Sequence, residues 1–177
     1  MRALVLGGIR SGKSQWAEAA IARAVSDDQP VRYLATGAVA GLDPDWSARV
    51  ATHRNRRPAH WSTVETRDVA TQLQADSRTA TLVDDVGGWL VAAMDRCGAW
   101  TGGGVVDAVE DLLAAVDGFG GPLVLVSPEV GLSVVPATES GRRFTDELGM
   151  VNQRLAARCD RVVLVVAGQP LTVKETS

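Results

Sequence analysis

The stretch Gly7-Gly8-Ile9-Arg10-Ser11-Gly12-Lys13-Ser14 decides the fold class of this chain. It matches the pattern G-x-x-x-x-G-K-[ST], in which backbone N–H groups surround phosphate oxygens, the lysine reaches the terminal phosphates and the last hydroxyl ligates magnesium. All eight residues are therefore candidates to bind a nucleoside triphosphate, with Lys13 also catalytic and Ser14 also a metal ligand. The alternative is a glycine-rich strand-to-helix turn with an incidental lysine.

The sequence on either side of this phosphate loop predicts an α/β fold. Residues 2–6 are typical of a buried strand, with an apolar run after Arg2, and apolar side chains recur at helical spacing from residue 12 to about 25. Further strands are expected at 31–35, 80–83, 122–127 and 161–167, helices at 44–54, 86–96, 103–117 and 139–158, and a possible extra strand at 61–65. Because strands and helices alternate, we expect a mostly parallel sheet flanked by helices, P-loop NTPase-like and RecA-like in arrangement, as a single domain over 1–177.

Composition narrows the class of protein. The net charge of −3 argues against a general nucleic-acid binder. Cys97 and Cys159 stand far apart without metal-ligand spacing, which indicates neither disulfides nor zinc. The first residues do not resemble a signal peptide, and no apolar stretch is long enough to span a bilayer. We expect a cytoplasmic protein that binds neither membranes nor nucleic acid.

A phosphate loop needs a second acidic residue, at the end of a neighbouring strand, to hold magnesium through water. Asp84 directly follows the apolar run 80–83, and Asp85 is its rival. A carboxylate at such a strand-to-helix junction can instead cap the helix. Beside a phosphate loop the magnesium interpretation is favoured, with Asp84 as the ligand.

The segment around His53 and the two carboxylates Glu65 and Glu129 can each be interpreted as functional or as solvated surface. His53 lies in an arginine-rich segment that reads either as a solvated helix end or as a site where arginines bind phosphate and the imidazole acts as base or nucleophile. The residues alone favour the solvated helix end. Glu65 ends a possible strand and Glu129 lies just after another, where ligand sites of α/β sheets are found. A carboxylate at the first position is usually solvated, and Glu129 can instead cap the turn.

Taken together, several ordered segments are similar to one known family, the bifunctional adenosylcobinamide kinase and adenosylcobinamide-phosphate guanylyltransferase of cobalamin biosynthesis. The resemblance covers nearly the whole chain. It is carried by the phosphate loop, Tyr33-Leu34-Ala35-Thr36, Arg49-Val50-x-x-His53, Arg57-Pro58-x-x-Trp61-x-Thr63-x-Glu65, Leu82-Val83-Asp84, Glu129-Val130-Gly131, Val135-Pro136 and the segment from Arg143 to Ala156. The chain departs from many relatives at Asp45-Trp46 and at Pro128, next to the expected acceptor side.

The resemblance implies two reactions at one site. ATP or GTP phosphorylates adenosylcobinamide, and GTP then donates GMP to adenosylcobinamide phosphate through a guanylylated histidine. His53 matches that histidine, which reverses the preference stated above. The resemblance also implies Mg²⁺ and a homotrimer, and it implies that the guanine nucleotide site is lined by Ala35, Thr36, Gly37, Arg54, Asn55, Arg56, Arg57, Glu65 and Asp84.

Two alternatives remain at this point. The first is a small-molecule kinase that uses the phosphate loop without a covalent intermediate. The second is a nucleotide-gated binding module, but such switches usually read guanine through an Asn-Lys-x-Asp segment, and this sequence has none.

Overall fold

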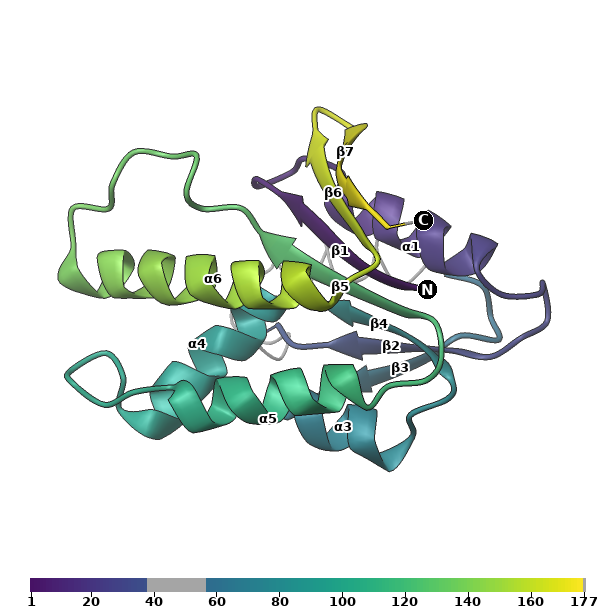
Figure 1. Ribbon diagram of the computed structural model, residues 1–177, viewed down its shortest axis with the longest axis horizontal. Helices are drawn as coiled ribbons and strands as arrows, with labels where there is room; N and C mark the ends of the chain where they lie inside the picture. The colour runs from purple at the N-terminus through teal and green to yellow at the C-terminus, as the bar shows by residue number, and fades with distance from the viewer. Residues whose placement is uncertain (38–56, 177) are drawn as a thin grey trace.

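The computed structural model describes residues 1–37 and 57–176. Within them lies a mostly parallel sheet with helices on both faces, so the predicted α/β class is confirmed (Figure 1). The helix expected at 44–54 lies outside the described residues.

The described sheet has seven strands in the order β3-β2-β4-β5-β1-β6-β7. All neighbouring pairs are parallel except β6 and β7, which form an antiparallel hairpin at one edge. The strands are β1 (Arg2–Gly7), β2 (Val31–Ala35), β3 (Ser62–Glu65), β4 (Ala80–Asp84), β5 (Leu123–Pro128), β6 (Arg161–Val166) and β7 (Gln169–Glu175). The phosphate loop thus follows a strand in the interior of the sheet.

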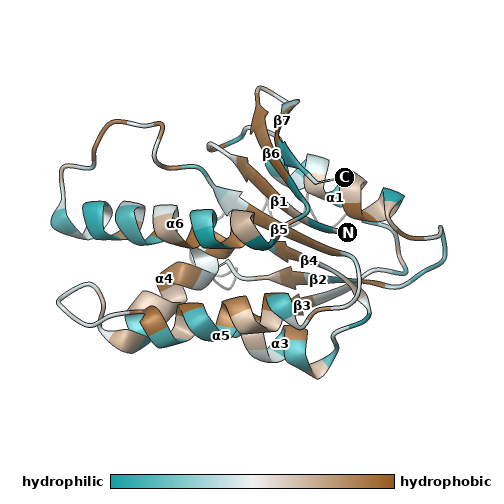
Figure 2. Ribbon diagram, in the orientation of Figure 1, coloured by the Kyte–Doolittle hydropathy of each residue, from teal (hydrophilic) through white to brown (hydrophobic). Residues whose placement is uncertain are grey.

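The described helices divide unequally between the two faces (Figure 1). Helix α1 (Lys13–Arg23) covers one face, where Ala17 and Ile21 pack on Val5, Leu82 and their neighbours. The opposite face is covered by α3 (Val69–Ala75), α4 (Val86–Cys97), α5 (Val106–Asp117) and α6 (Glu139–Arg158). The inner strands alternate their side chains between these two cores, so they are mostly apolar, as Figure 2 shows in brown.

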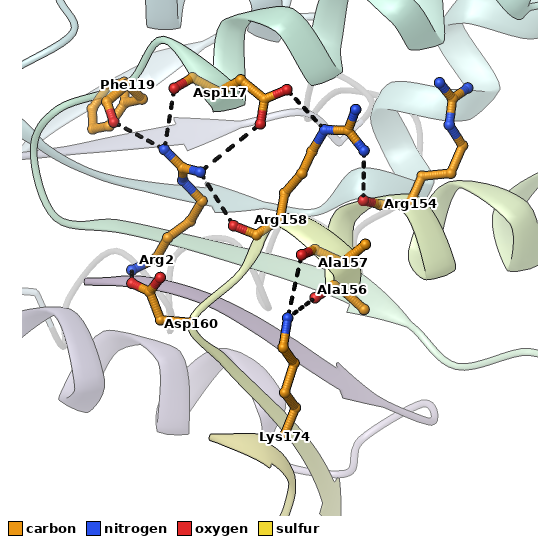
Figure 3. Close-up of polar contacts among 9 residues, drawn as sticks. All are labelled: Arg2, Asp117, Phe119, Arg154, Ala156, Ala157, Arg158, Asp160 and Lys174. Carbon is orange, nitrogen blue, oxygen red and sulfur yellow. Dashed lines mark hydrogen bonds and ion pairs between the residues drawn. The ribbon is translucent and has the colours of Figure 1, made fainter. Parts of the chain in front are cut away.

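The start of β1 is joined to the ends of α5 and α6 by charged side chains (Figure 3). The Arg2 guanidinium donates to the carbonyls of Phe119 and Arg158, at the ends of α5 and α6, while its backbone N–H donates to Asp160 at 2.7 Å. Asp117 pairs with Arg158 at 3.0 Å. These contacts lie at the end of the sheet opposite the phosphate loop and fix the two helices to the start of β1.

Three features differ from the sequence prediction. Strand β7 was not predicted, because its residues are mostly exposed and lack an apolar alternation. Helix α3 was also missed, because seven residues show only two buried positions, Val69 and Leu73. The expectation that Asp84 follows a strand next to β1 is wrong: β5 lies between β4 and β1. Hydrophobic pattern predicts which strands exist and not their lateral order, since all the inner strands here are mostly apolar.

Candidate nucleotide site

The phosphate loop joins the carboxyl end of β1 to the amino end of α1. Arg10 and Gly12 have positive φ values of 57° and 94°, so the chain turns tightly and directs the loop towards the helix N-terminus. Gly7 is enclosed: a Cβ there would lie 2.4 Å from Ser11 Oγ and 2.8 Å from the Val165 carbonyl. A Cβ on Gly8 would meet nothing within 4 Å, and Ile9 is exposed. The loop is therefore packed on its inner side and open on its outer side.

Neighbouring elements hold the loop in place. The Gly168 N–H, at the tip of the β6–β7 hairpin, donates to the Ser11 carbonyl at 2.8 Å, and the Glu129 N–H donates to the Gly7 carbonyl at 3.0 Å. Lys13 is half-buried and its Nζ donates to the Gly8 carbonyl at 3.3 Å. The lysine ammonium thus lies across the loop, where it can contact a bound phosphate.

The two neighbouring acidic residues at the end of β4 have different roles. Asp85 is the N-cap of α4 and accepts from the Gly88 N–H at 2.8 Å. Burial raises the pKa of Asp85, the charge of Asp84 raises it further, and the Gly88 N–H and Lys13 oppose the rise. Asp84 does not cap the helix; its carboxylate accepts a hydrogen bond from the Tyr33 hydroxyl. Asp85, and not Asp84, is therefore the residue that caps the helix.

Thr36 joins the ends of β2 and β4. Its buried hydroxyl accepts from the Asp85 N–H at 2.9 Å and donates to the Asp85 carbonyl. Its own N–H donates to the Asp84 carbonyl at 3.1 Å, and the Ala35 carbonyl accepts from Thr66 on the other side. The structure thus uses the Thr36 hydroxyl to fix the backbone around Asp84.

Two other candidates line a shared groove of about 860 Å³. Gly37 follows β2, and Glu65 ends the neighbouring strand β3, where its side chain is exposed. Among the described residues the groove is also lined by Arg67 and Asp68, by Trp89 and Arg96 of α4, and by residues of α3 and α5. Gly37 and Glu65 therefore lie together at the carboxyl ends of two paired strands.

Arg57 is buried against α1 and does not point freely into solvent. Its guanidinium carbon lies 3.3 Å from the centroid of the Tyr33 ring, and its Nε lies 3.7 Å from Glu18 Oε1. Its Nη1 donates to Thr63 Oγ1 at 2.9 Å. The Arg57 side chain is 8% exposed and that of Glu18 is 12% exposed, so this ion pair is shielded from water.

The remaining candidates, His53, Arg54, Asn55 and Arg56, lie outside the described residues. Sequence reasoning missed Glu18 and Tyr33 as parts of the site. A signal for Glu18 existed, since residues four apart on a helix share a face and Glu18 follows Ser14 by four. Tyr33 lies inside an apolar strand run, where a tyrosine is typical of the core, so the sequence indicates it only through the family resemblance.

The arrangement fits a magnesium ion that is shared with phosphates. Among the described residues no group of three or more His, Cys, Asp or Glu side chains could hold a metal ion. Magnesium at nucleotide sites needs no such cage, because one or two protein oxygens, phosphate oxygens and water complete its shell. The Ser14 hydroxyl and the Asp84 carboxylate supply hard oxygen ligands of this kind.

Comparison with solved structures shows the same fold in other proteins. A prototypical ATPase from the type III secretion system of pathogenic bacteria matches with a TM-score of 0.55 at 15% identity, over 92% of this chain and 50% of that one. The ATPase EscN of enteropathogenic E. coli matches with a TM-score of 0.56 at 13% identity, over 94% and 43%. This chain spans about half the length of these ATPases or less, and the likeness shows the P-loop fold alone.

Sequence comparison is more specific. The model of the family described as cobinamide kinase / cobinamide phosphate guanyltransferase matches residues 3–173. A relative from Pseudomonas aeruginosa, named bifunctional adenosylcobalamin biosynthesis protein CobP, is 40% identical over 98% of both chains. The Salmonella typhimurium protein CobU, with the same description, is 38% identical over 98% of this chain and all of that one. The chain therefore belongs to the cobinamide kinase / cobinamide phosphate guanyltransferase family.

Proposed function

We propose that this protein phosphorylates adenosylcobinamide with ATP or GTP and then transfers GMP from GTP to adenosylcobinamide phosphate. Family membership supports this pair of reactions. The observation that supports it most directly is the open phosphate loop, with Lys13 lying across it and a carboxylate, Asp84, that is not used to cap a helix.

In the kinase step the acceptor hydroxyl attacks the γ-phosphorus, and the nucleoside diphosphate leaves. The loop N–H groups and Lys13 hold the phosphates in line and stabilise the charge that develops on them. Ser14 and Asp84 would hold Mg²⁺, which neutralises charge on the phosphate oxygens when it is bound.

In the transfer step we assign His53 as the nucleophile. A neutral imidazole nitrogen forms a bond to the α-phosphorus of GTP, the bond to the bridging oxygen breaks, and pyrophosphate leaves. A phosphate oxygen of adenosylcobinamide phosphate then attacks the same phosphorus, the P–N bond breaks, and adenosylcobinamide-GDP is released. The covalent intermediate lets one site handle a small donor and a bulky acceptor in turn.

We assign the groove beside Gly37 and Glu65 to the guanosine of GTP. The Glu65 carboxylate is exposed there and can accept hydrogen bonds from a ribose or from a guanine edge. Arg54, Asn55 and Arg56 are assigned to the nucleotide site on sequence resemblance. Arg57 is assigned to the same site on the same ground, but its side chain is buried beside Tyr33.

A cytoplasmic location and a homotrimer are part of the same proposal. The location rests on the composition, with its two separated cysteines, and the trimer rests on the resemblance. No helix in the described part of the chain is long and apolar enough to cross a membrane. We expect no contact with nucleic acid, in keeping with the net charge of −3.

Product analysis tests this function. The protein is incubated with adenosylcobinamide, Mg²⁺ and GTP, and the products are identified by mass spectrometry. We expect both the phosphate and the GDP-linked product. Phosphate alone would indicate a monofunctional kinase, and slow GTP hydrolysis without any corrinoid product would indicate a nucleotide-gated module.

A further inference from the structure

A group of polar side chains, most of them buried, lies beneath the expected metal position, and the proposed reaction gives no role to two of its members, Tyr33 and Glu18. Tyr33 on β2 donates its hydroxyl proton to Asp84, and Arg57 covers the Tyr33 ring. Arg57 is in turn fixed by Glu18 of α1 and Thr63 of β3. The group therefore links β2, β3, β4 and α1 on one face of the sheet.

Its position relative to the phosphate loop follows from helix and strand geometry. Glu18 lies one turn after Ser14 on α1, so the two side chains share a face of that helix. Tyr33 pairs with Leu82 across β2 and β4, and both belong to the core beneath α1. Asp84 follows Leu82 by two residues and so has its side chain on this same face. The group thus lies between the strand that bears Asp84 and the helix that bears Ser14.

We propose that Tyr33 and Arg57 are positioning residues that fix the Asp84 carboxylate for Mg²⁺–nucleotide binding. This inference rests on the proposed function, in which Asp84 is a metal ligand. One carboxylate oxygen accepts the Tyr33 hydroxyl, which sets the rotation of the group and leaves the other oxygen for the ion. The Arg57 cation over the ring draws electron density from the phenol and strengthens its O–H as a donor.

Glu18 gives Arg57 an acidic partner other than Asp84. The two form a shielded ion pair, and we expect the negative charge of Asp84 to remain available for a cation at the phosphate loop. Breaking the pair at Glu18 would leave Arg57 free to attract Asp84 instead.

The test measures binding of a fluorescent GTP analogue to the full-length protein across a Mg²⁺ titration, and again in EDTA. Tyr33→Phe keeps the ring under Arg57 and removes only the donor. We expect about a tenfold rise in the Mg²⁺ concentration for half-maximal binding, with metal-free affinity unchanged. Arg57→Met should give a smaller rise in the same direction, and Arg57→Lys should restore part of the loss because it returns the charge.

Thr81→Val is the matched control, because it removes a fully buried hydroxyl near the amino end of β4, the strand that ends at Asp84. It should lower the unfolding midpoint without moving the Mg²⁺ dependence. An unchanged Mg²⁺ requirement in Tyr33→Phe, or an equal loss of binding with and without the metal, would overturn the positioning role. A wild-type protein that binds the analogue equally well in EDTA would instead refute the magnesium site of the proposed function.

Discussion

At the scale of single residues, the phosphate loop depends on how closely its glycines approach other atoms. Gly7 sits against Ser11 Oγ and the Val165 carbonyl of the neighbouring strand, and the second of these is backbone that cannot rotate away. Gly8 faces open space. The two adjacent glycines therefore differ in what a methyl group would do.

We predict that Gly7→Ala destabilises the protein by about 1–3 kcal/mol, the usual range for overpacking, and weakens nucleotide binding because the loop must shift. Urea unfolding and titration with a fluorescent GTP analogue measure the two effects. Gly8→Ala is the control and should alter stability far less. Equal stability losses in the two variants would contradict this account of the packing.

The two cysteines should differ in reactivity. Burial raises the pKa of the Cys159 thiol to about 12, whereas Cys97 is exposed at the end of α4. Because the thiolate is the reacting form, a disulfide reagent at about pH 8 should titrate one thiol in the folded protein and two after denaturation. The Cys97→Ser variant should not react until it is unfolded. Rapid reaction of that variant in its folded state would show that Cys159 is accessible.

The residues of the site differ in how far sequence predicts them. The phosphate loop can be predicted from the sequence, because its glycines, lysine and serine each meet a separate steric or chemical requirement. Asp84 and Asp85 are indistinguishable as letters, and only the cap to Gly88 and the Tyr33 hydroxyl separate their roles. Arg57 reads as one of several solvated arginines, because its partner Glu18 is 39 residues away in the chain.

At the scale of elements, the turn between α3 and β4 depends on one carboxylate. Asp76 accepts from the N–H groups of Arg78 at 3.1 Å and Thr79 at 3.0 Å, and it pairs with Arg32 at 3.7 Å. The hydrogen bonds to Thr79 and Arg78, with a smaller contribution from Arg32, lower the pKa of Asp76 to about 2. Its ionised form is therefore favoured by folding.

This shift predicts a pH-dependent stability difference. The Asp76 carboxylate stabilises the fold fully above its ordinary pKa of 3.8, and that contribution is lost as pH falls towards about 2. Asp76→Asn should therefore lower the urea midpoint at about pH 6, and its deficit against wild type should shrink as pH falls from about 4 to 2. Asp28→Asn, at an exposed position after α1, should show no such trend. A constant deficit for Asp76→Asn would indicate that the charge plays no part.

Elements that bury a clear apolar face were predictable, and those that do not were missed. Helix α6 has a strong apolar stripe and begins and ends where predicted, at Glu139 and Arg158. Strand β7 exposes nearly all of its side chains and forms because the Ala167-Gly168 turn, with φ values of 50° and 77°, returns the chain along β6. The sequence signal for β7 was this turn and not its own pattern.

At the scale of the whole molecule, the site depends on the order of the strands. Because β5 lies between β1 and β4, the phosphate loop and Asp84 are two strands apart, and α1 spans the distance between them on one face. The apolar strand sequences do not encode that order individually, because the inner strands are buried on both faces. The sequence therefore predicted the strands themselves and not which of them lie next to each other.

The central claim is that one phosphate loop serves a transfer that passes through His53. The most direct measurement is incubation of the protein with GTP labelled at the α-phosphorus, followed by denaturing electrophoresis and acid treatment. We predict a labelled, acid-labile protein band that is absent in His53→Ala, while that variant still phosphorylates adenosylcobinamide. A band of equal intensity in His53→Ala would contradict the account.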